Sequence, residues 1–235
     1  MNIIAVSIIF LIIMELVLLP LYVRYKKRKY KPWLKRAIKG TMTLISFAFC
    51  LAAILKLHNE QGGWFGLKTA AGFETNILVA AALFVCAVAD VVLTINLAAG
   101  GVLFLLGHVC YISYFLTLAR PQYVCVGLII VPAFFAYKYF AKYTADIGMI
   151  KYGMYMYGIT ILGTFSLGIV LPYTLGGYGW LPAIASTLLV ISDFMLATNS
   201  VTKAKVMDDL IYLGFYFSGQ YVMALSVFYP VFLNL

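Results

Sequence analysis

Eight runs of about twenty apolar residues, separated by short polar or Gly/Pro segments, dominate this sequence. A bilayer core about 30 Å thick needs roughly 20 apolar residues per helix, so each run is long enough to span a membrane. We therefore predict an all-α integral membrane protein that forms a single membrane domain over residues 1–235. The eight predicted transmembrane helices cover 2–23, 37–57, 76–96, 98–118, 122–142, 151–171, 179–199 and 206–229.

Composition supports this class and excludes others. Of the 235 residues, 64% are hydrophobic and only 11% are charged, whereas a soluble domain carries about a quarter charged residues. A disordered chain, a disulfide-stapled secreted domain and a cytosolic nucleic-acid binder are excluded, although the formal net charge is +9. The four cysteines lie in apolar runs without CxxC spacing, which favours buried free thiols.

Two features fix how the runs are connected. The first run should remain as a membrane helix, because no basic residue precedes it and no small-residue cleavage pattern follows it. The third and fourth runs are separated only by residues 96–98. A continuous helix there would overshoot the membrane about twofold, so we predict a tight hairpin.

The basic residues indicate the orientation of the helices. Nine of the 17 Lys and Arg residues lie in 24–39, and fourteen in all lie in odd-numbered loops. This bias places the odd-numbered loops in the cytosol and both termini on the non-cytoplasmic side, and we expect a multi-pass protein of a bacterial cell membrane. The basic loops also attract anionic headgroups of the lipid bilayer, at about 1 kcal/mol per residue, and no nucleic-acid partner is expected.

The chain contains a repeated pattern. Segments 90–96 and 193–199 share the pattern D-x-x-L-x-x-N at an offset of 103 positions. Two further matches, 39–42 with 151–154 and 107–108 with 219–220, stand 112 positions apart. An even-numbered unit repeats in the same orientation, so we predict two parallel four-helix repeats, approximately 1–118 and 119–235.

Three acidic residues lie inside predicted spans: Glu15, Asp90 and Asp193. An ionised carboxylate near the bilayer centre costs at least about 2.5 to 3.5 kcal/mol, so such a residue is a functional candidate. Asp90 and Asp193 each stand fifteenth in a helix that runs toward the cytosol, roughly 9 Å from its end. We therefore expect both at one depth. Glu15 has no counterpart in the repeat, and a neighbouring helix or protonation should relieve its charge.

Repeat-related polar residues complete a predicted chamber in the cytosolic half. His108 and Gln220 are expected to point into the same space as the aspartates. A purely structural role would also explain these two residues, since hydrogen bonds between membrane helices contribute roughly 0.6 to 2 kcal/mol to helix association. Both interpretations remain open for His108 and Gln220. The aspartates favour a functional role, because hydroxyls or amides would join helices without a costly charge.

Four further residues lie near the cytosolic side of this chamber. Asn96 and Asn199 follow the aspartates by six positions and are expected to line its mouth or to cap helix ends. Lys39 and Lys151 are expected to begin the second and sixth helices. There an ammonium can meet a phosphate while its aliphatic stem lies along apolar surface.

The sequence resembles the YhhN family of lysoplasmalogenase-like membrane proteins. The resemblance rests on segments 89–93 (ADVVL), 107–111 (GHVCY), 190–197 (VISDFMLA) and 217–221 (FSGQY), and extends over about 39–227. It implies eight membrane helices and, in characterised members, hydrolysis of the vinyl ether of lysoplasmalogens to a fatty aldehyde and a glycerophospho-alcohol. The family's two functional aspartates map onto Asp90 and Asp193. One departure is Gly40, because family members usually carry proline after the lysine at this position.

The residue chemistry fits that reaction. Protonation of the vinyl ether β-carbon gives an oxocarbenium ion that water captures, so one neutral carboxylic acid and one carboxylate suffice. The sequence does not say which aspartate is which. His108 and Gln220 would orient water or the substrate oxygen, and Tyr111 and Tyr221 would shield the cation. No metal or cofactor is expected, and the predicted partner is a lysophospholipid substrate from the cytosolic leaflet.

Two other functions are compatible with the pattern. A duplicated bundle with intramembrane carboxylates is typical of proton-coupled transporters of small molecules or lipids. Transporters usually break helices at matching positions of both halves, yet Pro132 has no counterpart beyond Pro20, which favours the enzyme. A lipid-sensing scaffold gains no support from long loops or tails. The sequence leaves open the preferred headgroup and the oligomeric state.

Overall fold

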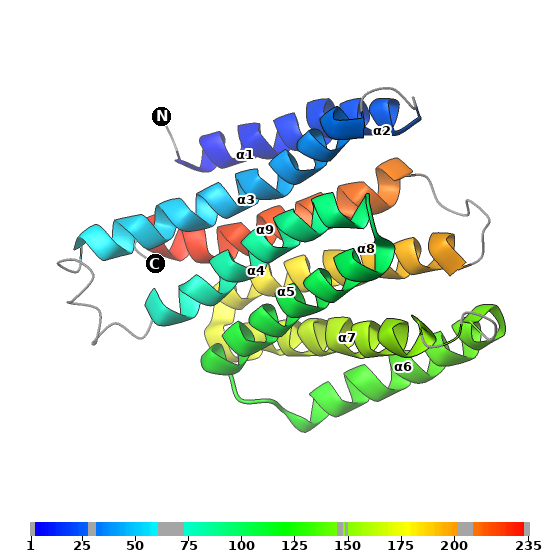
Figure 1. Cartoon of the computed structure of the whole chain (residues 1–235). Helices are drawn as coiled ribbons and strands as arrows, with labels where there is room; N and C mark the ends of the chain where they lie inside the picture. The colour runs from blue at the N-terminus through cyan, green and yellow to red at the C-terminus, as the bar shows by residue number, and fades with distance from the viewer. Residues whose placement is uncertain are drawn as a thin grey trace.

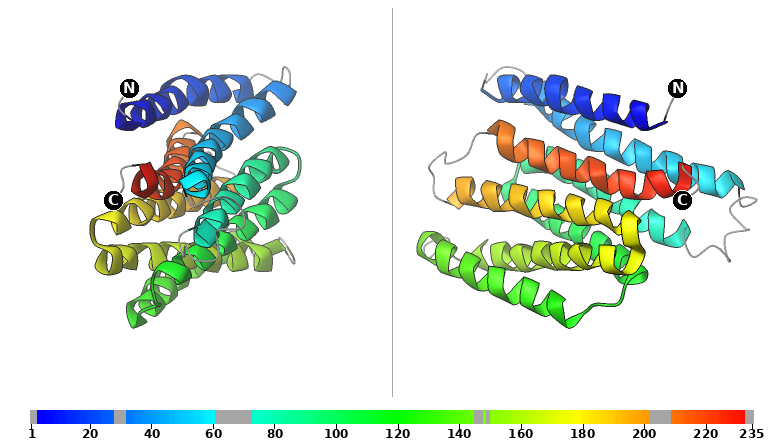
Figure 2. Two further views of the ribbon diagram at one scale, coloured as in Figure 1. Left: turned by 90° about the vertical axis from the view of Figure 1, so that its left-hand side faces the viewer. Right: turned by 180° about the vertical axis from the view of Figure 1, so that it is seen from behind.

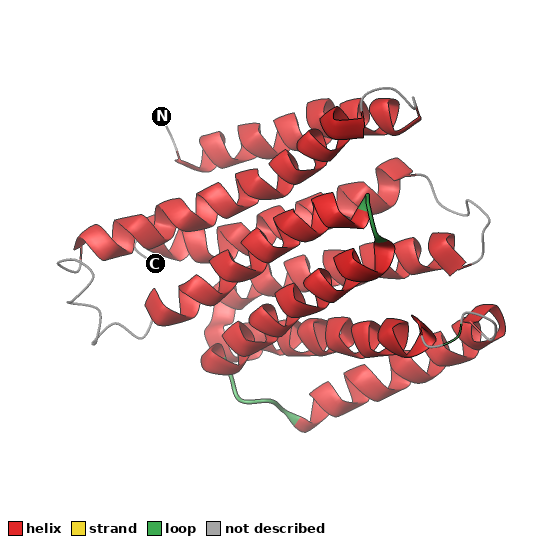
Figure 3. Cartoon of the chain, viewed as in Figure 1, coloured by secondary structure: helices red, strands yellow, loops and turns green. Residues whose placement is uncertain are grey.

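The computed structural model describes residues 3–27, 32–60, 73–144, 148, 150–201 and 209–232, and all secondary structure within them is helical (Figure 3). Eight helical segments are long and apolar enough to span a membrane, so the predicted all-α membrane fold is confirmed. The elements are α1 (Ile3–Ile13), the π-helical η1 (Met14–Leu18), α2 (Leu19–Lys27), α3 (Pro32–Glu60), α4 (Phe73–Leu93), α5 (Leu97–Leu118), α6 (Tyr123–Thr144), α7 (Ile150–Leu175), the 3-10 turn η3 (Gly176–Gly179), α8 (Trp180–Val201) and α9 (Asp209–Phe232). Elements α1, η1 and α2 together form the first span.

The helices form an elongated bundle in which α1–α2 and α6 lie at opposite edges (Figures 1 and 2). The first and last described residues lie toward the same end of the bundle, as an even number of spans requires. Large apolar side chains such as Leu16, Val102 and Phe135 are exposed on the outer surface, where lipid tails would contact them. The predicted orientation rests partly on basic residues at 28, 29, 31, 68, 203 and 205, which lie outside the described residues.

The predicted hairpin between the third and fourth spans is present. Helix α4 ends at Leu93, and the amides of residues 94–96 donate to the carbonyls of Val91 and Val92. The Asn96 side chain accepts a hydrogen bond from the Ala99 amide at 3.1 Å and caps α5. The expectation that the third span continues through Asn96 is therefore wrong by three residues, because asparagine is a better N-cap than a helix interior residue.

Helix α3 begins earlier than expected. It starts at Pro32, so Lys39 lies about two turns inside the helix and does not begin it. Proline is favoured at the first helical position, and the residues after it are compatible with a helix. Gly40, the departure from the family pattern, leaves α3 unbroken. A Cβ atom there would lie 3.1 Å from Val91 Cγ2, so the glycine allows α3 to approach α4 closely.

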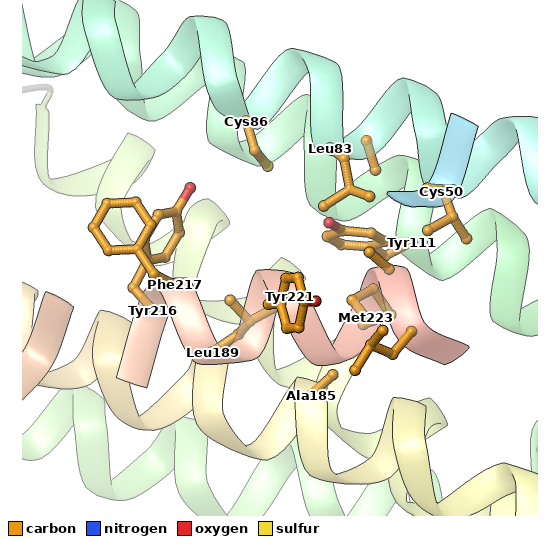
Figure 4. Close-up of a cluster of buried hydrophobic side chains, with 14 of the residues drawn as sticks. Cys50, Leu83, Cys86, Tyr111, Ala185, Leu189, Tyr216, Phe217, Tyr221 and Met223 are labelled. Atoms are coloured by element: carbon orange, nitrogen blue, oxygen red, sulfur yellow. The ribbon is translucent and has the colours of Figure 1, made fainter. Parts of the chain in front are cut away.

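The two halves pack with the same order of contacts. Helices α3, α4 and α5 pack in series, as do α7, α8 and α9, while α5 packs on α7 and α9 packs on α3. A Cβ atom on Gly107 would lie 2.6 Å from Cys86 Sγ, and one on Gly219 would lie 3.0 Å from the Leu189 side chain. Cys86 and Leu189 extend from α4 and α8 into the core (Figure 4) and are 103 positions apart, the offset of the two aspartates. This packing agrees with the repeat pattern of the sequence.

Candidate active site between the two aspartates

One cavity contains both intramembrane aspartates. It has a volume of about 190 Å³ and is lined by residues of α2, α3, α4, α5, α8 and α9. Asp90 and Asp193 contribute to its wall, together with apolar side chains such as Leu93, Phe104 and Leu213. Three lysines also line it, and we call the part of the cavity beside them the basic mouth. Its lysines are Lys26, Lys35 and Lys39.

Asp90 is held as part of a buried ion pair. Its side chain has no exposed surface, and Oδ1 lies 3.0 Å from Lys39 Nζ. Oδ2 accepts hydrogen bonds from Thr43 Oγ1 at 2.5 Å and from the Tyr216 hydroxyl at 3.1 Å. An ammonium and two hydroxyl donors are the partners that stabilise a carboxylate in a membrane interior. Asp90 is thus surrounded by donors from α3 and α9.

Asp193 has a different environment. It is 8% exposed, and its Oδ2 atom is buried without a hydrogen bond to any described residue. His108 Nε2 lies 3.7 Å from Oδ2, which is too long for a hydrogen bond. The Tyr157 hydroxyl interacts with the same carboxyl group. Asp193 therefore retains one oxygen that is unsatisfied within the described part of the chain.

His108 lies behind Asp193 and does not line the cavity. Its Nδ1 atom is 3.1 Å from Thr164 Oγ1, and that hydroxyl donates to the Thr160 carbonyl at 3.2 Å. Because the hydroxyl proton is used there, Thr164 accepts from Nδ1–H, and this assignment leaves Nε2 as the acceptor that faces Asp193. The Nε2 lone pair therefore lies 3.7 Å from Asp193 Oδ2.

Gln220 and Tyr111 form a buried polar pair outside the cavity wall. The Tyr111 hydroxyl donates to Gln220 Oε1 at 2.6 Å, and Gln220 Nε2 has no hydrogen-bond partner among the described residues. Tyr221 faces elsewhere, since its hydroxyl donates to the Ser7 carbonyl of α1 at 2.8 Å. Figure 4 shows both tyrosines in the apolar core around α9. Neither tyrosine lines the cavity, where a cation would form.

The remaining predicted site residues lie apart from the aspartates. Asn96 caps α5, and Asn199 lies in the last turn of α8, so neither lines the cavity. Lys151 also lies outside the cavity, with Nζ 5.3 Å from the centre of the Tyr152 ring. Lys39 lines the cavity, but Asp90 already holds its ammonium. The repeat-related lysines therefore differ in their contacts.

Sequence reasoning missed the hydroxyl groups that hold the site. Thr43 lies four residues after Lys39, and Tyr216 lies four residues before Gln220, so helical spacing would have placed both on the correct faces. Thr164 gave no such signal, because its partner His108 lies on another helix. Only the packing of α5 on α7 brings these two residues together.

Glu15 is held by a neighbouring helix, one of the two expected solutions. Its Oε1 atom accepts a hydrogen bond from Ser218 Oγ of α9 at 2.9 Å. Glu15 lies in the π-helical segment of the first span and takes no part in the cavity. In the described part of the chain the four cysteines are free thiols, and no group of three or more metal-ligating side chains occurs.

Comparison with known proteins gives one result. The sequence matches the family model of the YhhN family over residues 35–227. No curated protein and no solved structure matches the chain significantly. The matched region covers most of the chain and includes both aspartates and His108. The chain therefore belongs to the YhhN family.

Proposed function

We propose that this protein is an intramembrane hydrolase that cleaves the vinyl ether bond of lysoplasmalogens, releasing a fatty aldehyde and a glycerophospho-alcohol. The observation that carries the proposal is a single cavity, within the membrane-spanning region, lined by two aspartates in unlike environments. Membership of the YhhN family is consistent with a hydrolase. Vinyl ether hydrolysis needs one carboxyl group that gives a proton and one that stays an anion.

Asp90 is suited to be the permanent anion. The Lys39 ammonium forms an ion pair with Oδ1, and Thr43 and Tyr216 donate hydrogen bonds to Oδ2. These partners stabilise the carboxylate and fix its position before the substrate arrives. The oxocarbenium ion that forms in the cavity is a cation, so a fixed negative group in the wall lowers its free energy.

Asp193 is suited to be the proton donor. Its side chain lines the cavity, and its Oδ2 atom, which has no hydrogen-bond partner among the described residues, lies 3.7 Å from His108 Nε2, which accepts or returns a proton. In the first step the Asp193 carboxyl transfers its proton to the β-carbon of the vinyl ether, and the α-carbon becomes the oxocarbenium carbon. His108 acts through Asp193 and is thus a positioning residue.

A water molecule completes the reaction, and the Asp193 carboxyl group returns to its starting form. The Asp193 carboxylate takes a proton from the water that attacks the α-carbon, which yields a hemiacetal and restores the carboxylic acid. In the collapse step this carboxyl gives a proton to the glyceryl oxygen and takes one from the hemiacetal hydroxyl. The carbon–oxygen bond breaks, and an aldehyde and an alcohol leave. This use of one carboxyl as acid and then base parallels retaining glycosidases.

The proposal is tested with purified protein in detergent. Lysoplasmenylethanolamine should yield a free fatty aldehyde, detected by mass spectrometry. The matched control is the 1-O-alkyl lysolipid, which lacks only the double bond and should yield none. A folded protein that releases no aldehyde from the vinyl ether would contradict the proposal.

A proton-coupled transporter is the second candidate. The observation in its favour is the duplicated packing, with a cavity that residues of both halves line. Proteoliposomes separate the two functions. Movement of an intact lipid or small molecule across the bilayer, without aldehyde release, would favour the transporter.

A further inference from the structure

One lysine of the basic mouth has no ion-pair or hydrogen-bond partner among the described residues. Lys26 Nζ lies 2.9 Å from Asp209 Oδ1 and also donates to the Tyr212 hydroxyl at 3.3 Å. Lys39 is paired with Asp90. Lys35 lines the same cavity, but it forms no ion pair or hydrogen bond with another described residue. An unpaired ammonium beside apolar side chains is costly unless a ligand or water compensates it.

Two of the three lysines of the basic mouth have carboxylate partners, Lys26 with Asp209 and Lys39 with Asp90. Lys35 has no such partner among the described residues. A phosphate oxygen is an anionic acceptor of the kind that an ammonium binds.

We propose that Lys35 binds the phosphate group of a lysophospholipid whose chain enters the cavity. The proposal rests on the proposed function, since it assigns the headgroup end of that substrate. Lys35 and Lys39 stand four residues apart and so share a face of α3. Leu93 and Leu97 line the same cavity and offer apolar surface for the part of the lipid hydrocarbon chain next to the glycerol.

Two other described basic residues have contacts outside the cavity. Arg36, next to Lys35, donates from Nε to Thr94 Oγ1 at 3.1 Å and joins α3 to the α4–α5 turn. Lys138 on α6 is exposed and lies 5.3 Å from the centre of the Phe134 ring, outside the cavity. Lys138 is therefore a matched control for the loss of one positive charge.

The experiment measures binding, so it does not depend on catalysis. Full-length protein in detergent is titrated with 1-O-alkyl lysophosphatidylethanolamine, which has the phosphate but no vinyl ether, and with 1-O-alkylglycerol, which lacks the phosphate. The proteins are the wild type, Lys35→Ala, Lys35→Arg and Lys138→Ala. Thermal unfolding of each variant shows that it is folded.

Lys35→Ala should weaken binding of the phospholipid about tenfold, because a charge-assisted hydrogen bond is lost. Binding of alkylglycerol should be unchanged. Lys35→Arg should restore most of the affinity, and Lys138→Ala should have no effect. Equal phospholipid affinity of the wild type and Lys35→Ala would overturn the proposal, as would an equal loss for both lipids.

Competition with inorganic phosphate shows whether Lys35 binds a lipid headgroup or a free phosphate ion. At millimolar concentration it should not displace the phospholipid, because it lacks the chain. If phosphate alone binds as tightly and depends on Lys35, the site serves a free anion and the lipid assignment is wrong. Absence of aldehyde release with Lys35-dependent phospholipid binding would reject the proposed function but leave this inference standing.

Discussion

The two halves of the molecule present the same residue type, aspartate, in opposite settings. In the N-terminal half, Asp90 is fully buried, Lys39 Nζ forms an ion pair with its Oδ1 atom, and the hydroxyls of Thr43 and Tyr216 donate hydrogen bonds to Oδ2. In the C-terminal half, Asp193 keeps one oxygen without a hydrogen bond to any described residue, and a histidine stands behind it. The two carboxyl groups on one cavity therefore have unlike partners.

The difference arises in the helices around each aspartate. The lysine of the first half pairs with Asp90, whereas its counterpart Lys151 lies over a tyrosine ring. His108 approaches Asp193, whereas its counterpart Gln220 binds a tyrosine hydroxyl. A repeated framework with diverged side chains thus surrounds the two aspartates with different partners.

The largest expected effect is the loss of the Asp90 ion pair. Lys39→Met should destabilise the protein by about 3 to 5 kcal/mol, because a buried carboxylate loses its partner. Lys151→Met is the matched control in the other half and should change stability by no more than about 0.5 kcal/mol. Thermal unfolding in detergent measures both. Equal losses would show that the two lysines are equivalent, against the structure.

A double variant sharpens this result. Asp90→Asn added to Lys39→Met should recover much of the lost stability, since no unpaired charge remains. An additive loss in the double variant would mean that the two residues do not act as a pair.

The next effect concerns the histidine behind Asp193. His108→Ala should lower kcat about a hundredfold with KM little changed, because proton transfer through Asp193 is slowed. Thr164→Val should give a smaller loss, since only the Nδ1 hydrogen bond disappears. Aldehyde release over a range of lysoplasmalogen concentrations separates kcat from KM. A change in KM alone would assign His108 to substrate binding.

A packing change tests the framework that the two halves share. Gly107→Ala should cost roughly 1 to 3 kcal/mol, because the new methyl group would lie 2.6 Å from Cys86 Sγ. Gly101→Ala on the same helix is the control, since nothing lies within 4 Å of a Cβ atom there, and it should be neutral or stabilising. Cys86→Ala should relieve the Gly107→Ala defect. Without this rescue, the close contact between α4 and α5 would not be the cause.

The smallest expected effect is at the hairpin. Asn96→Ala should cost about 1 kcal/mol of stability through loss of the α5 cap. Aldehyde release should not change, since Asn96 does not line the cavity. A selective loss of activity without a change in unfolding temperature would instead place Asn96 at the mouth of the site.

Most of the framework could be predicted from the sequence. The length of the apolar runs located the eight spans, and residues 96–98 indicated a hairpin. The depth of Asp90 and Asp193 in their helices followed from helical rise, and the structure places both on one cavity. These features depend on local periodicity and the thickness of a bilayer, so sequence reasoning reaches them.

The contacts of each aspartate were beyond such reasoning. Lys39 and Lys151 occupy equivalent positions in the repeat, yet only Lys39 contacts an aspartate. Thr164 meets His108 only because α5 packs on α7. Tyr221 was expected to shield the cation, but its side chain faces α1, where its hydroxyl donates to the Ser7 carbonyl. Each of these facts depends on how helices distant in sequence face one another.

The most direct test of the two-aspartate account is aldehyde release from lysoplasmalogen by purified variants. Asp193→Asn should reduce the rate by about two to four orders of magnitude, because the proton donor is lost. Asp90→Asn, combined with Lys39→Met to keep the core neutral, should also lose most activity, while both proteins unfold cooperatively. Full activity in both variants would contradict the account.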